Sequence, residues 1–177
     1  MKKSVKHLTL CAILGALSIV INVITRQLMP SEQFMIPLFV LPLIIGSILL
    51  GPVTGGMMGL VVDIASFFIG GGINFLPLMT LSRVMWGVLP FFFYYQKNKI
   101  ILLVGIFLTH LIATAINSLA LFIAFNVGMI PFISARLAML PVNVVVLTFL
   151  TIIIISRLPE EIQSLIKNSS YQEQTNV

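Results

Sequence analysis

The chain alternates long apolar runs with a few short polar clusters. The stretches without Asp, Glu, Lys or Arg cover residues 8–25, 33–62, 64–82, 100–135 and 137–156. Several of them exceed the roughly 18 to 20 residues that a helix needs to cross about 30 Å of hydrocarbon. Backbone polar groups cannot stay unpaired in lipid, so clusters of Gly, Pro and Asn are expected where the chain turns outside it. The pattern therefore predicts an all-α membrane protein with six helices, at about 8–25, 36–50, 53–70, 77–95, 100–125 and 129–156.

Composition excludes a soluble domain. Apolar residues make up 59% of the 177 residues and charged residues only 8%, whereas about a quarter of the residues in a soluble domain are charged. The net charge of +5 does not indicate nucleic-acid binding, because the lysines fall at the ends of apolar segments rather than in one patch. We therefore expect a multi-pass protein of the bacterial cell membrane with no nucleic-acid partner.

The basic residues also predict the orientation. With six helices, both tails and the loops near residues 51 and 96–99 share one side of the membrane, and Arg26 alone lies at the opposite face. Basic residues mark the cytoplasmic side, so both termini are predicted to be cytoplasmic. The expected parts are a tail at 1–7, a six-helix domain at 8–157 and a second tail at 158–177. The basic start and first apolar run lack a clear cleavage site, so we interpret them as a retained helix. The basic residues on the predicted cytoplasmic side are Lys2, Lys3, Lys6, Lys97, Lys99, Arg157 and Lys167.

The chain lacks the residue sets of common enzymes. It contains no Ser-His-Asp set, no paired catalytic carboxylates, no HExxH and no P-loop. The single Cys11 excludes an internal disulfide and a multi-cysteine metal site. We therefore expect no catalytic residue, no metal and no cofactor, and a membrane-embedded enzyme is disfavoured.

Ionisable residues inside the apolar runs are the strongest functional signal, because such groups mark binding sites or pathways by default. At 1.5 Å per residue, Asp63 lies roughly 17 Å from the cytoplasmic side, and Arg83 and Arg136 lie roughly 9 Å below the outer side. Polar groups from five helices fall at similar height, which predicts one outward-facing cavity. The candidate substrate-binding residues are Arg26, Asp63, Asn74, Arg83, Asn117 and Arg136.

Two interpretations of Asp63 and Arg83 stay open at this point. They lie on neighbouring antiparallel helices and can simply neutralise each other, since unpaired charge in hydrocarbon is costly. That pairing does not account for Arg26 and Arg136, so the site remains cationic and a carboxylate held by guanidinium groups is the economical ligand. Other polar residues are weaker signals. His110 and Asn143 are typical of interhelical hydrogen bonding, and Trp86 of anchoring near the membrane interface.

Small residues form two close-packing patterns. Ala12 and Ala16 lie four apart on the first predicted helix, beside Gly15, and Gly55 and Gly59 repeat the spacing on the third. Such spacing permits close helix approach. For the third helix we favour packing within the bundle.

The arrangement resembles the substrate-binding S components of energy-coupling factor (ECF) vitamin transporters, over roughly residues 5–157. Six short helices with cytoplasmic basic ends, the Ala12–Ala16 pair and Gly51-Pro52 before the third helix carry the likeness. The resemblance implies that Ala12, Gly15 and Ala16 dock on a transmembrane coupling subunit, which joins two ATPase subunits. It thus implies a transport subunit that is not itself an enzyme, with ATP hydrolysis in its partners.

Within that family the chain looks most like the folate-type branch. The matching features are Gly55, Gly59 and Asp63 after Gly51-Pro52, Pro77 with Thr80-Leu81-Ser82 and Gly87, Asn117 with Leu119 and Leu121, and Arg136 with Pro141. Two departures matter. No tryptophan follows Asn117, and Arg83 stands where folate binders carry a small residue. Losing an aromatic platform weakens the case for a flat pterin, so the prediction shifts narrowly to pantothenate, with folate close behind.

An alternative from another class is an ion-coupled secondary carrier of a small organic anion, using Asp63 as a proton or sodium site. Such carriers are commonly built from two repeat halves. The sequence contains no convincing internal repeat, which favours the S component.

Overall fold

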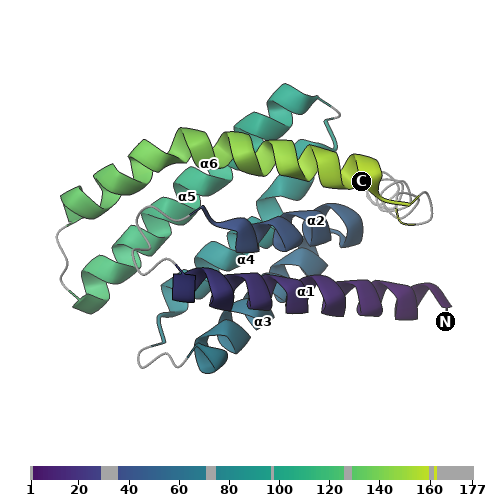
Figure 1. Cartoon of the computed structure of the whole chain (residues 1–177), viewed down its shortest axis with the longest axis horizontal. Coiled ribbons are helices and arrows are strands. Elements are labelled where there is room, and N and C mark those ends of the chain that lie inside the picture. The colour runs from purple at the N-terminus through teal and green to yellow at the C-terminus, as the bar shows by residue number, and fades with distance from the viewer. Residues whose placement is uncertain are drawn as a thin grey trace.

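A computed structural model describes residues 2–28, 36–70, 75–96, 98–125, 129–159 and 162. These residues form six α-helices and one short 3₁₀ helix, with no strand among them, which confirms the predicted all-α fold. The start of α1 and the end of α6 lie at the same end of the bundle (Figure 1). The elements are α1 (Lys2–Leu28), η1 (Leu38–Val40), α2 (Leu41–Leu50), α3 (Pro52–Ile69), α4 (Pro77–Tyr94), α5 (Lys99–Phe125) and α6 (Met129–Arg157).

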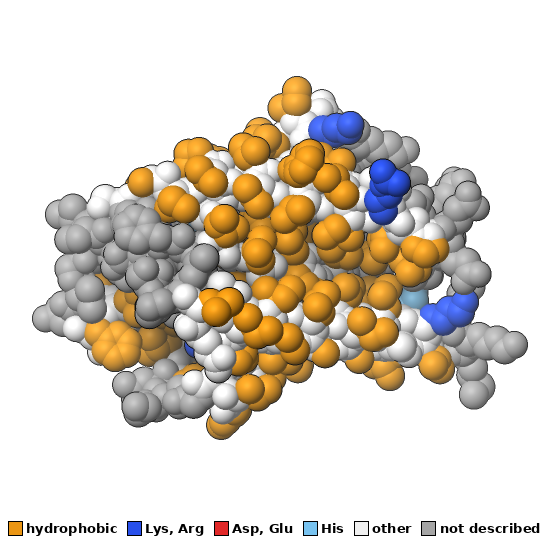
Figure 2. All heavy atoms as spheres, viewed as in Figure 1, with side chains coloured by type: hydrophobic (Ala, Val, Ile, Leu, Met, Phe, Trp, Pro, Cys, Tyr) orange, Lys and Arg blue, Asp and Glu red, His pale blue; other side chains and the backbone are white. Residues whose placement is uncertain are grey.

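Four helices are long and apolar enough to cross a membrane: α1 over Val5–Leu28, α3, α5, and α6 over Arg136–Arg157. Their outer faces carry large apolar side chains, among them Leu8, Phe68 and Phe149. Figure 2 shows apolar side chains spread over the whole central part of the visible face. A surface of this kind is favourable against lipid and unfavourable against water. The chain is a multi-pass membrane protein.

The second predicted span differs from the structure in length and surroundings. Residues 36–50 were expected to form one helix, but η1 and the ten-residue α2 occupy this stretch. Ten residues rise only about 15 Å, and all ten are buried between α1, α3, α4 and α6. Pro42 lies at the start of α2, where its missing N–H is tolerated, and Gly51 ends the helix at φ 92°. α2 is therefore the centre of the core rather than a lipid-facing span.

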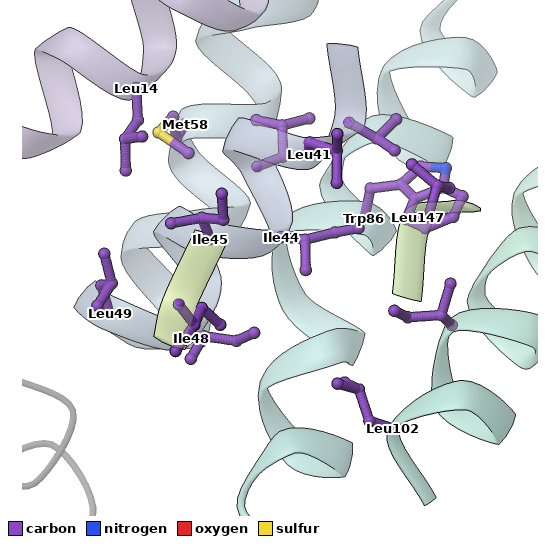
Figure 3. Close-up of a cluster of buried hydrophobic side chains, with 14 of the residues drawn as sticks. Leu14, Leu41, Ile44, Ile45, Ile48, Leu49, Met58, Trp86, Leu102 and Leu147 are labelled. Atoms are coloured by element: carbon purple, nitrogen blue, oxygen red, sulfur yellow. The ribbon is translucent and has the colours of Figure 1, made fainter. Parts of the chain in front are cut away.

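The core forms around α2. Ile44 and Ile48 of α2 are fully buried, and Figure 3 shows Leu14 of α1 and Met58 of α3 pointing toward each other beside this helix. Trp86 of α4 belongs to the same cluster. The core thus joins α1, α3 and α4 through a central apolar helix.

α3 and α4 approach each other through backbone contact. A Cβ added to Gly55 would lie 2.1 Å from the carbonyl oxygen of Gly87, and one added to Gly59 would lie 2.6 Å from the carbonyl oxygen of Arg83. Any side chain at these positions would push the helices apart. The glycine pair of α3 therefore packs within the bundle, as predicted, and it fixes the position of the α4 backbone at Arg83.

Candidate binding site

A cavity of about 110 Å³ lies between α1, η1, α4, α5 and α6. The described residues around it are mostly polar, which is unusual for space enclosed by apolar helices. They are Asn22, Arg26, Pro37, Phe39, Met79, Ser82, Arg83, Trp86, His110, Ala113, Thr114, Asn117, Arg136 and Asn143.

Helical periodicity brings these residues to one place. The lining residues of α4 begin at Met79 and continue three, four and seven positions later, which is the spacing of a single helix face. On α5 the same spacing runs from His110 to Asn117, and on α6 a step of seven separates Arg136 from Asn143. Each helix therefore presents one polar stripe inward and leaves its apolar faces for lipid and for packing.

Neighbouring side chains fix the orientation of Arg83 in the cavity wall. Its Nε lies 2.5 Å from Oδ1 of Asp63, and Thr80 Oγ1 donates a 2.6 Å hydrogen bond to Oδ2 of the same carboxylate. The guanidinium carbon lies 4.7 Å from the centroid of the Phe39 ring, within the range of a cation–π contact. The carboxylate, the hydroxyl and the ring therefore hold the Arg83 side chain in one orientation.

The structure brings together four of the six predicted substrate-binding residues. Arg26, Arg83, Asn117 and Arg136 all line the cavity, although they come from four different helices. Asp63 lies behind Arg83 on α3 and is not part of the described lining. The pairing of Asp63 with Arg83, which the sequence left open, is present.

The sixth predicted residue, Asn74, lies outside the described residues. The described lining carries three guanidinium groups and no carboxylate. Guanidinium groups bind carboxylates through paired, charge-assisted hydrogen bonds, so the cavity suits an anion. In the described ranges no group of three His, Cys, Asp or Glu side chains can hold a metal ion.

Seven further polar or aromatic residues line the cavity without having been predicted as site residues, namely Asn22, Phe39, Ser82, Trp86, His110, Thr114 and Asn143. His110 Nδ1 lies 3.2 Å from Thr114 Oγ1, and its Nε2 lies 3.4 Å from Asn143 Nδ2. The interhelical bond expected of His110 and Asn143 therefore exists, and both residues also face the cavity. Asn22 of α1 is another of the seven. It lies four positions before Arg26, a spacing that could have pointed to it.

The interface position suggested for Trp86 is wrong. Trp86 is only 4% exposed, and its ring packs edge-on against His110 with centroids 5.6 Å apart. A residue anchored at the lipid interface would present its ring to the headgroups. The sequence placed it near the end of α4, but the α4–α5 contact buries it in the cavity wall.

The predicted docking residues of α1 fall on two sides of that helix. Ala12 and Ala16 are exposed. Gly15 is buried, and a Cβ there would lie 3.6 Å from Met58 Cγ and 3.9 Å from Val62 Cγ2 of α3. Gly15 therefore packs inside this bundle, whereas the two alanines lie on the outward surface of α1 beside the exposed Ile13 and Leu17.

Comparisons with known proteins identify a family for the chain but no individual relative. No curated protein and no solved structure matches it. A family model described as "ECF transporter, substrate-specific component" matches residues 6–169, nearly the whole chain. The membrane helices and the polar cavity agree with a subunit that binds a small substrate. The chain belongs to the family of ECF transporter substrate-specific components.

Proposed function

We propose that this substrate-binding subunit of an ECF importer takes up a water-soluble vitamin that carries a carboxylate, and that pantothenate is favoured over folate. The observation that carries this proposal is the cationic wall formed by Arg26, Arg83 and Arg136. Arg83 is held by the Asp63 carboxylate and the Phe39 ring before any ligand arrives. A preorganised guanidinium loses little side-chain entropy on binding, which favours affinity.

The rest of the lining supports a compact ligand. The described cavity measures about 110 Å³, which a short amide-containing acid fills more readily than folate with its two-ring pterin. The uncharged part of the wall carries amide, imidazole and hydroxyl groups beside apolar side chains, which are Pro37, Phe39, Met79, Trp86 and Ala113. The amide, imidazole and hydroxyl groups can hydrogen-bond the amide and hydroxyls of pantothenate.

The position of Asp63 argues against the secondary-carrier alternative. Both of its carboxylate oxygens have partners, the Nε of Arg83 and the hydroxyl of Thr80. A coupling carboxylate must exchange a proton or a sodium ion during each cycle. With both oxygens engaged, Asp63 is better suited to holding Arg83 than to carrying a proton.

Energy for uptake is proposed to come from partner subunits in the bacterial cytoplasmic membrane. The chain would dock on the transmembrane coupling subunit, which joins two ATPase subunits, through the exposed side of α1 at Ala12 and Ala16. Small residues at this spacing let a second helix approach closely. ATP hydrolysis would take place in the partners, and this chain would perform no covalent chemistry.

Equilibrium binding to the purified subunit tests the proposal. Tritiated pantothenate should bind, and unlabelled pantothenate should displace it at much lower concentration than folate does. A preference for folate would contradict the choice of pantothenate, but the proposal of a carboxylate-binding site would stand. Binding of neither vitamin, or gradient-driven uptake by the chain without ATPase subunits, would contradict the proposed function.

A further inference from the structure

Asn22 has polar atoms that the fold leaves unused. The residue is fully buried on α1, and neither its Nδ2 nor its Oδ1 has a hydrogen-bond partner among the residues that the structure describes. A buried amide without partners is unfavourable, because it has lost its hydrogen bonds to water without gaining others. Asn22 also lines the cavity. A ligand in the cavity can supply the missing partners.

The residues of the cavity wall fall into two levels along the bundle. α1 and α6 run in opposite directions (Figure 1). Asn22 precedes Arg26 by four residues on α1, about 6 Å, and Asn143 follows Arg136 by seven residues on α6, about 10 Å. Both asparagines therefore lie nearer than their arginines to the end of the bundle where α1 starts and α6 ends.

α4 and α5 repeat this order. Trp86 follows Arg83 on α4, and His110 precedes Asn117 on α5, a helix that runs opposite to α4 across the short connection at residues 95–98. His110 contacts both Trp86 and Asn143, so these side chains lie at one height. On each helix one of these two lining residues lies farther inward. We call these residues the inner level, which comprises Asn22, Trp86, His110 and Asn143, and their partners the outer level, which comprises Arg26, Arg83, Asn117 and Arg136.

The two levels differ in charge. All three guanidinium groups of the described lining belong to the outer level, and the inner level offers uncharged donors and acceptors. Asn143 Oδ1, like the Asn22 amide, has no partner in the described part of the chain. The inner level therefore holds unused hydrogen-bonding groups on two helices that face the same cavity.

We infer that Asn22 is a specificity residue that hydrogen-bonds the uncharged polar end of the ligand, while the carboxylate lies at the outer level. This inference rests on the proposed function and extends it to the orientation of the ligand. The ligand class is an acid with a hydroxyl group about 5 to 10 Å from its carboxylate, the separation of the two levels along the helices. Simple short carboxylates lack this second group and bind more weakly.

A bulky apolar replacement tests the state of Asn22 without any ligand. Replacing a buried polar group that has no partner by an apolar group of similar size is neutral or stabilising. Asn22→Leu should therefore unfold at or above the wild-type temperature in the same detergent. Thr151→Val is the matched control, because Thr151 is fully buried, its Oγ1 is without a partner among the described residues, and it does not line the cavity. A clearly lower unfolding temperature for Asn22→Leu alone would overturn the inference, since it would mean that the amide holds the fold together.

Two analogues of pantothenate test the orientation. N-(dimethylbutanoyl)-β-alanine keeps the carboxylate but lacks both hydroxyls, and panthenol keeps the hydroxyls but has an alcohol in place of the carboxylate. Competition against tritiated pantothenate gives the affinity of each. Asn22→Leu should weaken pantothenate about tenfold, the effect of one lost hydrogen bond, and should leave the hydroxyl-free acid nearly unchanged. Arg136→Gln should weaken pantothenate and leave panthenol nearly unchanged. Thr151→Val should bind all three as the wild type does.

The outcomes separate this inference from the proposed function. If Asn22→Leu weakens pantothenate and its hydroxyl-free analogue equally, or weakens neither, the role of Asn22 is refuted although the vitamin is right. If Asn22→Leu instead abolishes discrimination against panthenol, the ligand lies in the reverse orientation and the inference fails. If the wild type binds neither pantothenate nor folate, the proposed function fails, and the unfolding comparison still decides whether Asn22 is an unused amide or a structural one.

Discussion

The two sides of α4 satisfy their polar groups in different ways. Toward α3, the backbones meet at Gly55 and Gly87, and the Asp63 carboxylate is fully engaged by Arg83 and Thr80. Toward α5 and α6, the lining includes amide atoms without partners in the described residues, as in Asn143. On the first side the buried carboxylate is satisfied without a ligand, and the close backbone contact gives rigidity. The second side leaves hydrogen-bonding capacity for a molecule that binds later.

Arg83 belongs to both sides of α4. Asp63 on α3 can therefore hold the Arg83 side chain in place while the same residue faces the cavity. Substitutions on the α3 side should therefore reduce stability first and binding second. Substitutions on the cavity side should do the reverse.

Asp63→Asn should have the largest effect. It removes the carboxylate beside a buried guanidinium, and breaking a buried pair from one side costs about 3 to 5 kcal/mol. Thermal unfolding in detergent should show this loss, together with weaker pantothenate binding. Uptake in cells should not acquire a dependence on the pH gradient, because both oxygens of the wild-type carboxylate are engaged by Arg83 and Thr80. Wild-type stability would contradict the role of Asp63 in holding Arg83. A new or lost requirement for a pH gradient would favour the ion-coupled secondary carrier.

Arg136→Ala should have the next largest effect, on binding rather than stability. Loss of a charge-assisted hydrogen bond to the ligand costs about 1.5 to 3 kcal/mol, or roughly ten- to hundredfold in affinity. Arg83→Ala should lose as much affinity but also stability, because it leaves Asp63 without its ion-pair partner. Titration of both purified variants with tritiated pantothenate measures the affinities. Undiminished affinity in both, with normal expression, would refute the cationic wall.

Gly55→Ala should destabilise the bundle by about 1 to 3 kcal/mol, since the added Cβ overlaps backbone that cannot move independently. Gly15→Ala is the matched control, because the nearest described neighbour of its Cβ would be Met58 Cγ at 3.6 Å, an ordinary contact. Thermal unfolding of the two variants compares a close helix crossing with a looser one. Equal stability of Gly55→Ala and Gly15→Ala would show that the α3–α4 contact can relax.

Ala12→Trp and Ala16→Trp should have the smallest effect on the isolated subunit. Both side chains are exposed, so pantothenate binding by purified protein should equal that of the wild type. Vitamin uptake by cells that also express the coupling and ATPase subunits should be lost, because a large ring holds apart two helices that must approach closely. Full uptake with tryptophan at both positions would remove the docking role of these alanines.

Helix number and the existence of a polar site followed from the sequence by itself. Apolar runs long enough to cross a bilayer predict helices whatever they pack against, and charge inside such runs is so costly that Arg83 and Arg136 had to mark a site or a pair. The distances along each helix follow from a rise of 1.5 Å per residue. That is why polar groups from five predicted helices could be placed at similar height before any contact was known.

The tertiary structure decided what each polar residue faces. The same helical spacing fits a lipid-facing, a packed or a cavity-lining residue, so the sequence did not separate Asp63, which holds Arg83, from the arginines that line the cavity. The sequence also could not show that every residue of α2 would be buried. Nor could it show that Trp86 would pack against His110 rather than lie at the membrane interface. These outcomes depend on how the helices pack against one another, because a neighbouring helix determines whether a side chain is covered, paired or left for a ligand.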